Sequence, residues 1–240
     1  MALGTEICTL QCLLHMHILI IAATALEIRP FLNRYRDGAP FLRRDMNIDV
    51  LITGIGLTAT VYRLMKQLTV TRPDFIIQAG VAGCFDTSIP LGSVVTVRQD
   101  TIADESVIEL KKLRTLFDLN LVPQNRPPYR SGWLVNPHRD LIKSTGLTAV
   151  RGISVNQITT KPETIHFFRD RFRPVTESME GAALHYVCLL EGIPFLQLRS
   201  LSNYIGERNK KKWNMQDSIL RLNDALEEVI PAAQEVPSRK

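Results

Sequence analysis

The sequence predicts an α/β fold in which helices cover both faces of one β-sheet. Short apolar segments alternate along the chain with segments of helical periodicity. Apart from residues 93–97, which alternate, these segments are apolar on both faces, so the sheet is expected to be covered on both sides. With 240 residues, 45% of them hydrophobic, the chain can bury one large core. A three-layer α/β/α arrangement follows from these observations.

Six strands are predicted from apolar runs bounded by glycine, proline or polar residues. The third ends in a glycine-rich turn at residues 80–83, and the sixth leads into a polar turn at residues 200–204. The predicted strands comprise residues 17–22, 49–53, 75–79, 93–97, 152–155 and 195–198.

Three helices are predicted, at residues 57–68, 180–191 and 217–230. The first and last carry apolar residues at helical spacing. The middle one is stopped by Gly192, and Pro194 follows it. Residues 116–133 contain three prolines and are predicted to form a loop, either at the surface or over a site.

Residues 16–240 are predicted to form a single domain, with residues 1–15 as an extension outside the fold. Met16 immediately precedes the first predicted strand and is a possible start of the protein. The apolar segment near the N-terminus does not fit a signal peptide, because Glu6 precedes it and no Lys or Arg does. His15 and His17 interrupt this segment, so it is too short to cross a membrane. No membrane association is expected.

The composition argues against several other classes of function. The net charge is +5, but the basic residues are dispersed among acidic ones, so no nucleic-acid partner is expected. The four cysteines form neither a zinc-type pair of pairs nor a disulfide framework typical of a small secreted protein. We therefore expect reduced thiols, no bound metal and a cytoplasmic location.

Polar residues that directly follow the strands are the candidate site, since chemistry in such sheets gathers at strand ends. Taken singly, each has an ordinary structural explanation. Glu27 could be a surface residue, and Glu180 could stabilise the start of a helix. The segment from Arg199 to Asn203 could be a solvated turn.

Together these residues resemble the nucleoside phosphorylase/nucleosidase superfamily, and specifically its hydrolytic branch, which includes methylthioadenosine/S-adenosylhomocysteine nucleosidase. The resemblance extends from His17 to about Ile230 and rests on six motifs in order. They are the first strand with Glu27, Thr53-Gly54-Ile55-Gly56, Gly80-Val81-Ala82-Gly83, Leu91-Gly92-Ser93-Val94-Val95, Met179-Glu180, and Arg199 to Asn203.

The resemblance implies a phosphorylase/hydrolase-like fold with a mixed central sheet, and a purine nucleoside as the substrate. It implies that Glu27 is the general base that activates water, and that Arg199 holds that water or Glu27 in place. Glu180 would bind both ribose hydroxyls, and Met179 would form an apolar floor beneath the sugar. The other substrate-binding residues that it implies are Gly80, Val81, Ala82 and Thr159. No cofactor is implied, and a homo-oligomer is expected in which a neighbouring subunit completes the 5′ side of the site.

Three departures from the family pattern are informative. Asn203 replaces the aspartate of the adenine-specific enzymes, and an amide offers a donor and an acceptor that suit O6 and N7 of a 6-oxopurine. Gln78 stands where the phosphorylases carry an arginine, so water is favoured over phosphate as the acceptor. Val81 replaces a serine that assists the water, which leaves the coordination of the water open.

The segment 202–208 resembles the futalosine hydrolases, which release hypoxanthine from futalosine in an alternative menaquinone pathway. The resemblance implies that Arg208 and Lys210 to Lys212 bind the carboxylate on the 5′ side of that substrate, although a lysine run is more often a solvated face. The rival hypotheses are an inosine-type or methylthioadenosine/S-adenosylhomocysteine nucleosidase, a purine nucleoside phosphorylase, and a nucleoside-binding protein without turnover.

Overall fold

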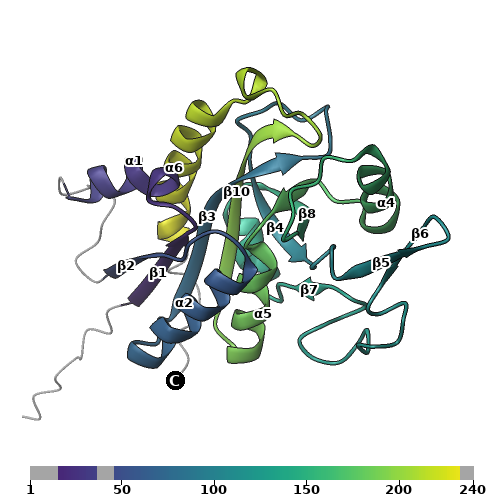
Figure 1. Ribbon diagram of the computed structural model, residues 1–240. Coiled ribbons are helices and arrows are strands. Elements are labelled where there is room, and N and C mark those ends of the chain that lie inside the picture. Colours follow the sequence, from purple (N-terminus) through teal and green to yellow (C-terminus); the bar gives the residue numbers. More distant parts are fainter. Residues whose placement is uncertain (1–15, 37–45, 233–240) are drawn as a thin grey trace, which may run out of the picture.

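A computed structural model describes residues 16–36 and 46–232, and one mixed eight-stranded sheet forms its centre (Figure 1). The predicted extension 1–15 lies outside the described residues. The strands of the sheet are β1 (Met16–Ala22), β2 (Met46–Ile52), β3 (Phe75–Cys84), β4 (Val94–Asp100), β7 (Leu134–Val135), β8 (Thr148–Ser154), β9 (Thr176–Ser178) and β10 (Phe195–Tyr204). A separate hairpin consists of β5 (Ser106–Glu109) and β6 (Lys112–Thr115).

The sheet combines parallel and antiparallel pairs, as the resemblance implies. Strand β3 is parallel to β1 and β10, whereas β9 pairs with it antiparallel. Strand β10 also pairs antiparallel with β4, and β4 and β9 both pair in parallel with β8. The path β3–β10–β4–β8–β9 therefore returns to β3, and this part of the sheet closes on itself.

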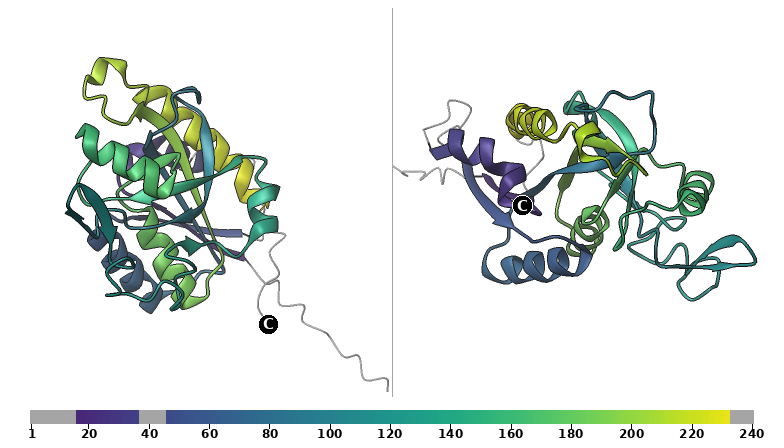
Figure 2. Two further views of the ribbon diagram at one scale, coloured as in Figure 1. Left: turned by 90° about the vertical axis from the view of Figure 1, so that its right-hand side faces the viewer. Right: turned by 45° about the horizontal axis from the view of Figure 1, so that its top comes forward.

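Helices cover both faces of the sheet. They are α1 (Ala25–Arg36), α2 (Leu57–Val70), α3 (Arg139–Ser144), α4 (Pro162–Phe172), α5 (Gly181–Glu191) and α6 (Met215–Ala232), with a short 3-10 helix at Lys210–Lys212. Helices α1 and α6 lie on one side of β1 and β3, and α2 and α5 lie on the other (Figure 2). The predicted three-layer architecture is confirmed.

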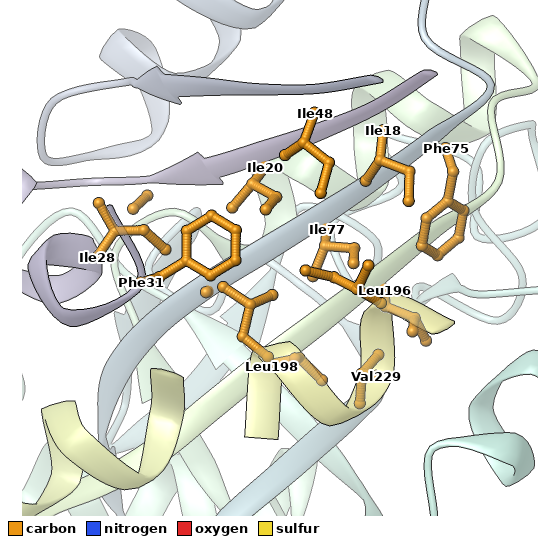
Figure 3. Close-up of a cluster of buried hydrophobic side chains, with 14 of the residues drawn as sticks. Ile18, Ile20, Ile28, Phe31, Ile48, Phe75, Ile77, Leu196, Leu198 and Val229 are labelled. Atoms are coloured by element: carbon orange, nitrogen blue, oxygen red, sulfur yellow. The ribbon is translucent and has the colours of Figure 1, made fainter. Parts of the chain in front are cut away.

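Strand β1 shows how the sequence produces these layers. Successive side chains of a strand point to opposite faces. Ile18 and Ile20 pack with α1 and α6 in the larger core cluster (Figure 3), whereas Leu19 and Ile21 pack against α2 and α5. All four are essentially inaccessible to solvent. The apolar run is continuous because both faces of the strand are buried.

All predicted strands and helices are present, but two predicted turns are wrong. Residues 80–83 belong to β3 and residues 200–204 belong to β10, which pair in parallel as far as Cys84 and Tyr204. The glycines and polar residues indicated turns, but pairing with neighbouring strands keeps both segments extended. Residues 116–133 form a loop as predicted, apart from an isolated bridge between Arg130 and Trp133.

Several elements were not predicted, namely α1, α3, α4, β7, β9 and the β5–β6 hairpin. A local signal for α1 exists, since Thr24-Ala25-Leu26-Glu27 is a capping-box pattern. Within the described residues, no helix combines the length and apolar character needed to cross a membrane.

Candidate functional site

A cavity of about 340 Å³ lies beside β1, β3, β9 and β10 and is called the site cavity below. Its volume falls within the range of small-molecule sites. Of the residues predicted to form the site, those that line it are Glu27, Val81, Ala82, Met179, Glu180, Asn203 and Arg208. Gly80, Thr159 and Arg199 do not line it. None of the loop residues 116–133 lines it either, so this loop does not cover the site.

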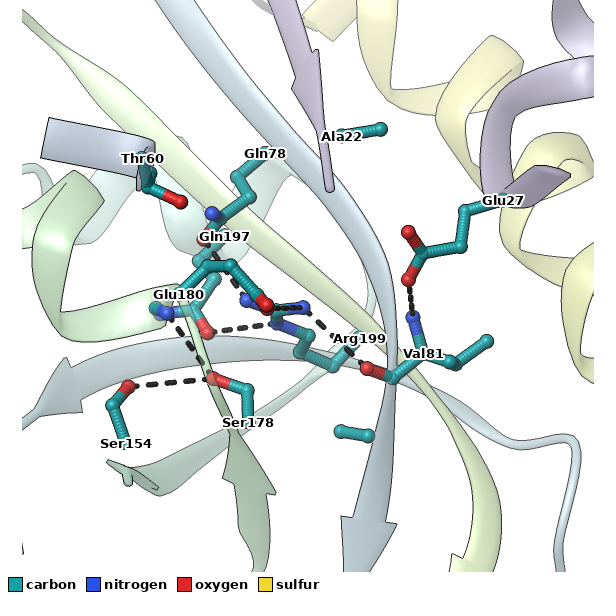
Figure 4. Close-up of polar contacts among 12 residues, drawn as sticks. Ala22, Glu27, Thr60, Gln78, Val81, Ser154, Ser178, Glu180, Gln197 and Arg199 are labelled. Carbon is teal, nitrogen blue, oxygen red and sulfur yellow. Dashed lines mark hydrogen bonds and ion pairs between the residues drawn. The ribbon is translucent and has the colours of Figure 1, made fainter. Parts of the chain in front are cut away.

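Glu27 lies in the first turn of α1 and is only 6% exposed. Its Oε2 accepts hydrogen bonds from the amide and hydroxyl of Thr24, at 3.0 and 2.9 Å. Its Oε1 accepts the Val81 amide at 3.1 Å (Figure 4). Burial raises the pKa of Glu27, and the Val81 amide, Arg199 and Thr24 oppose this shift. Glu27 therefore completes the helix cap and also presents a proton-accepting group to the cavity.

Glu180 is the N-cap residue of α5 and is almost completely buried. Its Oε1 accepts the Gly56 amide at 3.1 Å, so the predicted motif 53–56 contributes directly to the site. Its Oε2 forms an ion pair with Arg199 Nη1 at 3.5 Å. A carboxylate has further lone pairs beyond these two contacts, so Glu180 can still accept bonds from a ligand.

Arg199 is 1% exposed and lies behind the cavity wall, in contact with Glu180. Its Nε and Nη2 donate to the side-chain oxygens of Gln197 and Gln78, both at 3.1 Å. Its Nη1 lies 3.4 Å from the Val81 carbonyl oxygen. Every nitrogen of the guanidinium therefore has a partner, which makes Arg199 a positioning residue.

Gly80 has a steric role beside this guanidinium. It pairs with Arg199 across β3 and β10. A Cβ at this position would collide with Arg199 Nη1 and would lie 3.2 Å from Glu27 Oε1. The missing side chain therefore allows Arg199 and Glu27 to approach one another, which agrees with a glycine whose backbone faces a crowded site.

Behind the side chains that line the cavity, further polar side chains form a fully buried hydrogen-bond network. Asp100 accepts hydrogen bonds from Gln197 Nε2 at 3.1 Å and from the Ser154 hydroxyl at 3.0 Å. Complete burial raises the pKa of Asp100 to about 6, and these hydrogen bonds oppose the shift. Ser154 also accepts the Ala182 amide at the start of α5. This network connects the start of α5, where Glu180 is the N-cap residue, with β10, which carries Arg199. The motifs in the sequence did not reveal the network.

Asn203 lies where the β3–β10 register shifts. Leu201 pairs with Ala82 and Asn203 pairs with Gly83, so Ser202 is an extra residue in β10. Such a bulge redirects the following side chain. Asn203 Oδ1 accepts the Ser202 hydroxyl at 3.0 Å, and Nδ2 donates to the Tyr204 carbonyl at 3.2 Å. Each of these amide atoms retains capacity for one further hydrogen bond.

Glu177 also lines the cavity and was not predicted. It is 6% exposed, and its Oε1 accepts the Thr159 amide at 3.0 Å. Thr159, which does not line the cavity, therefore helps to position the Glu177 side chain through this hydrogen bond. Burial raises the pKa of Glu177, and contacts with Thr159 oppose the shift.

Arg208 and Trp213 line the cavity at the chain segment that leads into α6. The Arg208 guanidinium lies 5.5 Å from the centre of the Trp213 ring, within the range of a cation–π contact. Lys212 pairs with Glu207 at 2.9 Å, and none of residues 210–212 lines the cavity. Of the basic residues predicted to bind an anion, Arg208 alone reaches the cavity.

The described part of the chain contains no cluster of three or more His, Cys, Asp or Glu side chains that could hold a metal ion. The chemistry available from these residues is proton transfer by carboxylates and hydrogen bonding by amide and guanidinium groups.

A family model described as the phosphorylase superfamily matches residues 17–231. The chain belongs to the phosphorylase superfamily.

Its similarity to individual members points to the hydrolytic branch. A futalosine hydrolase of Streptomyces coelicolor is 24% identical over 233 residues, which cover 91% of this chain and 97% of the relative. A 5′-methylthioadenosine/S-adenosylhomocysteine nucleosidase of Geobacillus kaustophilus is 29% identical over 165 residues, which cover 67% of this chain and 68% of the relative.

The fold agrees with a solved structure. The futalosine hydrolase of Helicobacter pylori superimposes with a TM-score of 0.73 at 18% identity, covering 90% of this chain and 98% of that structure. The predicted phosphorylase/hydrolase-like fold is confirmed by this match. The prediction of an enzyme related to nucleosidases is also confirmed, since both relatives are named as hydrolases of this kind.

Proposed function

We propose that this protein hydrolyses the N-glycosidic bond of futalosine and releases hypoxanthine and dehypoxanthinyl futalosine. The observation that carries the proposal is that Glu27, Glu180 and Asn203 line one cavity. These are a buried proton acceptor, a ribose-binding carboxylate and an amide suited to a 6-oxopurine. Similarity over nearly the full length of a futalosine hydrolase supports the choice of substrate.

In the proposed reaction, Glu27 accepts a proton from water as the water oxygen attacks C1′ of the ribose. The bond between C1′ and N9 breaks, and its electron pair leaves with the purine. Glu180 accepts hydrogen bonds from the 2′- and 3′-hydroxyls and stabilises the positive charge that develops on the sugar. Arg199 holds Glu180 in position through their ion pair.

Asn203 stabilises the leaving base in this scheme. Hypoxanthine leaves protonated at N7, and the Asn203 amide can accept from N7–H while donating to O6. The base takes its N7 proton from solvent, and Glu27 returns the proton of the attacking water to solvent, so that protons balance over the reaction. Met179 and the backbone of Val81 and Ala82 would pack against the nucleoside.

Water rather than phosphate is proposed as the acceptor because of the environment of Gln78. This side chain is 2% exposed, and its Oε1 accepts a hydrogen bond from Arg199. It is therefore committed to positioning Arg199, and it carries no charge with which to hold a phosphate dianion.

Arg208 is the proposed partner of the carboxylate on the 5′ side of futalosine. It lines the cavity, and no carboxylate of the described residues lies within ion-pair distance of it. We also propose that the enzyme is cytoplasmic and acts as a homo-oligomer.

Adenine nucleosides are the second candidate substrates, because a methylthioadenosine/S-adenosylhomocysteine nucleosidase is among the relatives. Asn203 is the residue that argues against them. An inosine-type nucleosidase, a phosphorylase and a binding protein without turnover would each give a different pattern of base release.

The test is to measure base release from futalosine, inosine and methylthioadenosine, each with and without phosphate. We expect hypoxanthine release that is independent of phosphate and strongly favours futalosine. A requirement for phosphate would identify a phosphorylase, and preference for methylthioadenosine would identify an adenine nucleosidase. Binding without release from any of the three would contradict an enzymatic role.

A further inference from the structure

Asn223 of α6 is a fully buried polar residue that does not line the site cavity, yet its side chain bonds to the main chain of Glu27. Its Nδ2 donates to the Glu27 carbonyl oxygen at 2.8 Å and to the Ile219 carbonyl oxygen at 2.6 Å. Its Oδ1 accepts the Phe31 amide at 3.0 Å. One main-chain donor and two main-chain acceptors therefore surround this side chain, and a primary amide can satisfy all three.

The contacts of Asn223 with α1 lie next to a proline that interrupts the hydrogen-bond pattern of that helix. In a regular α-helix, each amide donates to the carbonyl four residues before it. Pro30 has no N–H, so it cannot donate to the Leu26 carbonyl. The next pair along the helix, Glu27 and Phe31, is the pair that Asn223 bridges. The turn that carries Glu27 therefore depends on α6 as well as on its own helix.

Glu27 is held by contacts from three elements. Its carboxylate accepts hydrogen bonds from Thr24, directly before α1, and from the Val81 amide of β3. Its main chain is bound by Asn223 of α6. The ion pairs that Arg34 forms with α6 lie two turns further along α1. Asn223 therefore connects α6 to the turn of α1 that carries the candidate base.

Resting on the proposed function, we propose that Asn223 is a positioning residue, which fixes the first turn of α1 so that the Glu27 carboxylate points at the attacking water. A catalytic group must lie within about 0.5 Å of its productive position, and a misplacement of about 1 Å can cost about 100-fold in rate. Asn223 also bonds to Ile219, which lines the cavity. One side chain thus sets the position of Glu27 relative to the cavity wall that α6 forms.

The first test is Asn223→Leu, because leucine branches like asparagine but has no polar atoms. The matched control is Asn136→Leu. Asn136 is also buried, bonds to the main chain of Phe195 and His138, and does not line the cavity. With futalosine we expect Asn223→Leu to lower kcat about 10- to 100-fold with little change in KM, and Asn136→Leu to lower Tm alone. Equal decreases of kcat and Tm in both variants would show a structural role and overturn the proposal.

The second test follows the Glu27 carboxyl itself and needs no substrate. Burial raises the pKa of Glu27, and the Val81 amide opposes that shift. A carboxylate displaced from Val81 should therefore titrate at a higher pH, which carbon-13 NMR of the carboxyl carbon measures. The other charged groups that act on Glu27 are Arg199 and Glu180, and Asn223→Leu changes neither. An unchanged pKa of Glu27 in this variant would overturn the proposal.

Asn223→Ala repeats both measurements without the larger methyl groups of leucine, so crowding of the core cannot decide the result. The outcomes also separate the inference from the proposed function. If futalosine is not hydrolysed but the pKa of Glu27 rises in both Asn223 variants and not in Asn136→Leu, the function fails and the positioning role stands. If futalosine is hydrolysed and the Asn223 variants match Asn136→Leu in kcat and in this pKa, the inference alone fails.

Discussion

Arg199 and Glu180 form an ion pair at 3.5 Å in which the side chains are 1% and 7% exposed. Charges taken this far from water are stable only as a pair with further hydrogen bonds. Arg199 donates such bonds to the side-chain oxygens of Gln197 and Gln78 and to the Val81 carbonyl, and Glu180 accepts one from the Gly56 amide. The pair therefore connects the positioning network behind the cavity to the carboxylate that faces it.

Replacing Arg199 by methionine should lower both stability and activity, because it leaves the Glu180 carboxylate buried without a counter-ion. We expect a loss of about 3–5 kcal/mol in the free energy of unfolding, measured in urea. Arg221→Met is the matched control, since Arg221 pairs with Asp217 at the surface. That variant should lose less than about 1 kcal/mol. Similar losses in both variants would contradict the importance of the buried pair.

Replacing Glu27 by glutamine should separate its role as a helix cap from its role as a base. We expect kcat to fall about 10²- to 10⁴-fold with little change in KM, because glutamine cannot accept the proton. Thr24→Ala removes the hydroxyl that bonds to Glu27 and should cost about 1 kcal/mol of stability with a much smaller effect on kcat. If both variants alter stability alone, Glu27 is only a cap residue.

Asn203 should determine which purine leaves. In Asn203→Asp, the carboxylate repels O6 of hypoxanthine, so kcat/KM for futalosine and inosine should fall about 10- to 100-fold or more. Release of adenine from methylthioadenosine should rise relative to them. Base release from all three nucleosides, followed by chromatography, measures the change. An equal decrease for every substrate would indicate damage to the site rather than altered selectivity.

Arg208 should matter for futalosine and not for inosine, which has no carboxylate on its 5′ side. We expect Arg208→Ala to raise KM for futalosine about 10- to 100-fold, the loss of a charge-assisted hydrogen bond, while KM for inosine changes little. Lys210→Ala is the control, because Lys210 is exposed and does not line the cavity. Equal effects of Arg208→Ala on both substrates would refute the proposed contact.

The stability of the protein should depend on pH through Asp100. Its pKa is about 6 when folded and 3.8 in an exposed carboxyl, so the folded state binds the proton more tightly. The contribution of Asp100 to the free energy of unfolding is therefore complete below about pH 4 and is lost as pH rises through 6. Over this range the free energy of unfolding should fall by about 3 kcal/mol. Urea unfolding of the natural protein and of Asp100→Asn across this range measures the difference. Parallel curves for the two proteins would contradict the assignment.

Local pattern by itself determined the layers of the fold. A strand buried on both faces requires a continuous apolar run, and an amphipathic helix requires apolar residues at helical spacing. These requirements act within a few residues, so β1, α2 and α6 were predictable from segments such as Ile18 to Ile21. Ordered motifs likewise identified Glu27, Glu180 and Asn203, which all line the cavity.

Only the tertiary structure decided which polar residues support Glu27, Glu180 and Asn203. Gln78, Asp100 and Gln197 belong to three strands that are far apart in the sequence. They meet because β10 pairs with both β3 and β4. The same pairing keeps residues 80–83 and 200–204 extended where their glycines and polar groups indicated turns. Glu177 reaches the cavity because β9 pairs with β3 at Gly83. Strand pairing joins distant segments, so its consequences cannot be read from any one of them.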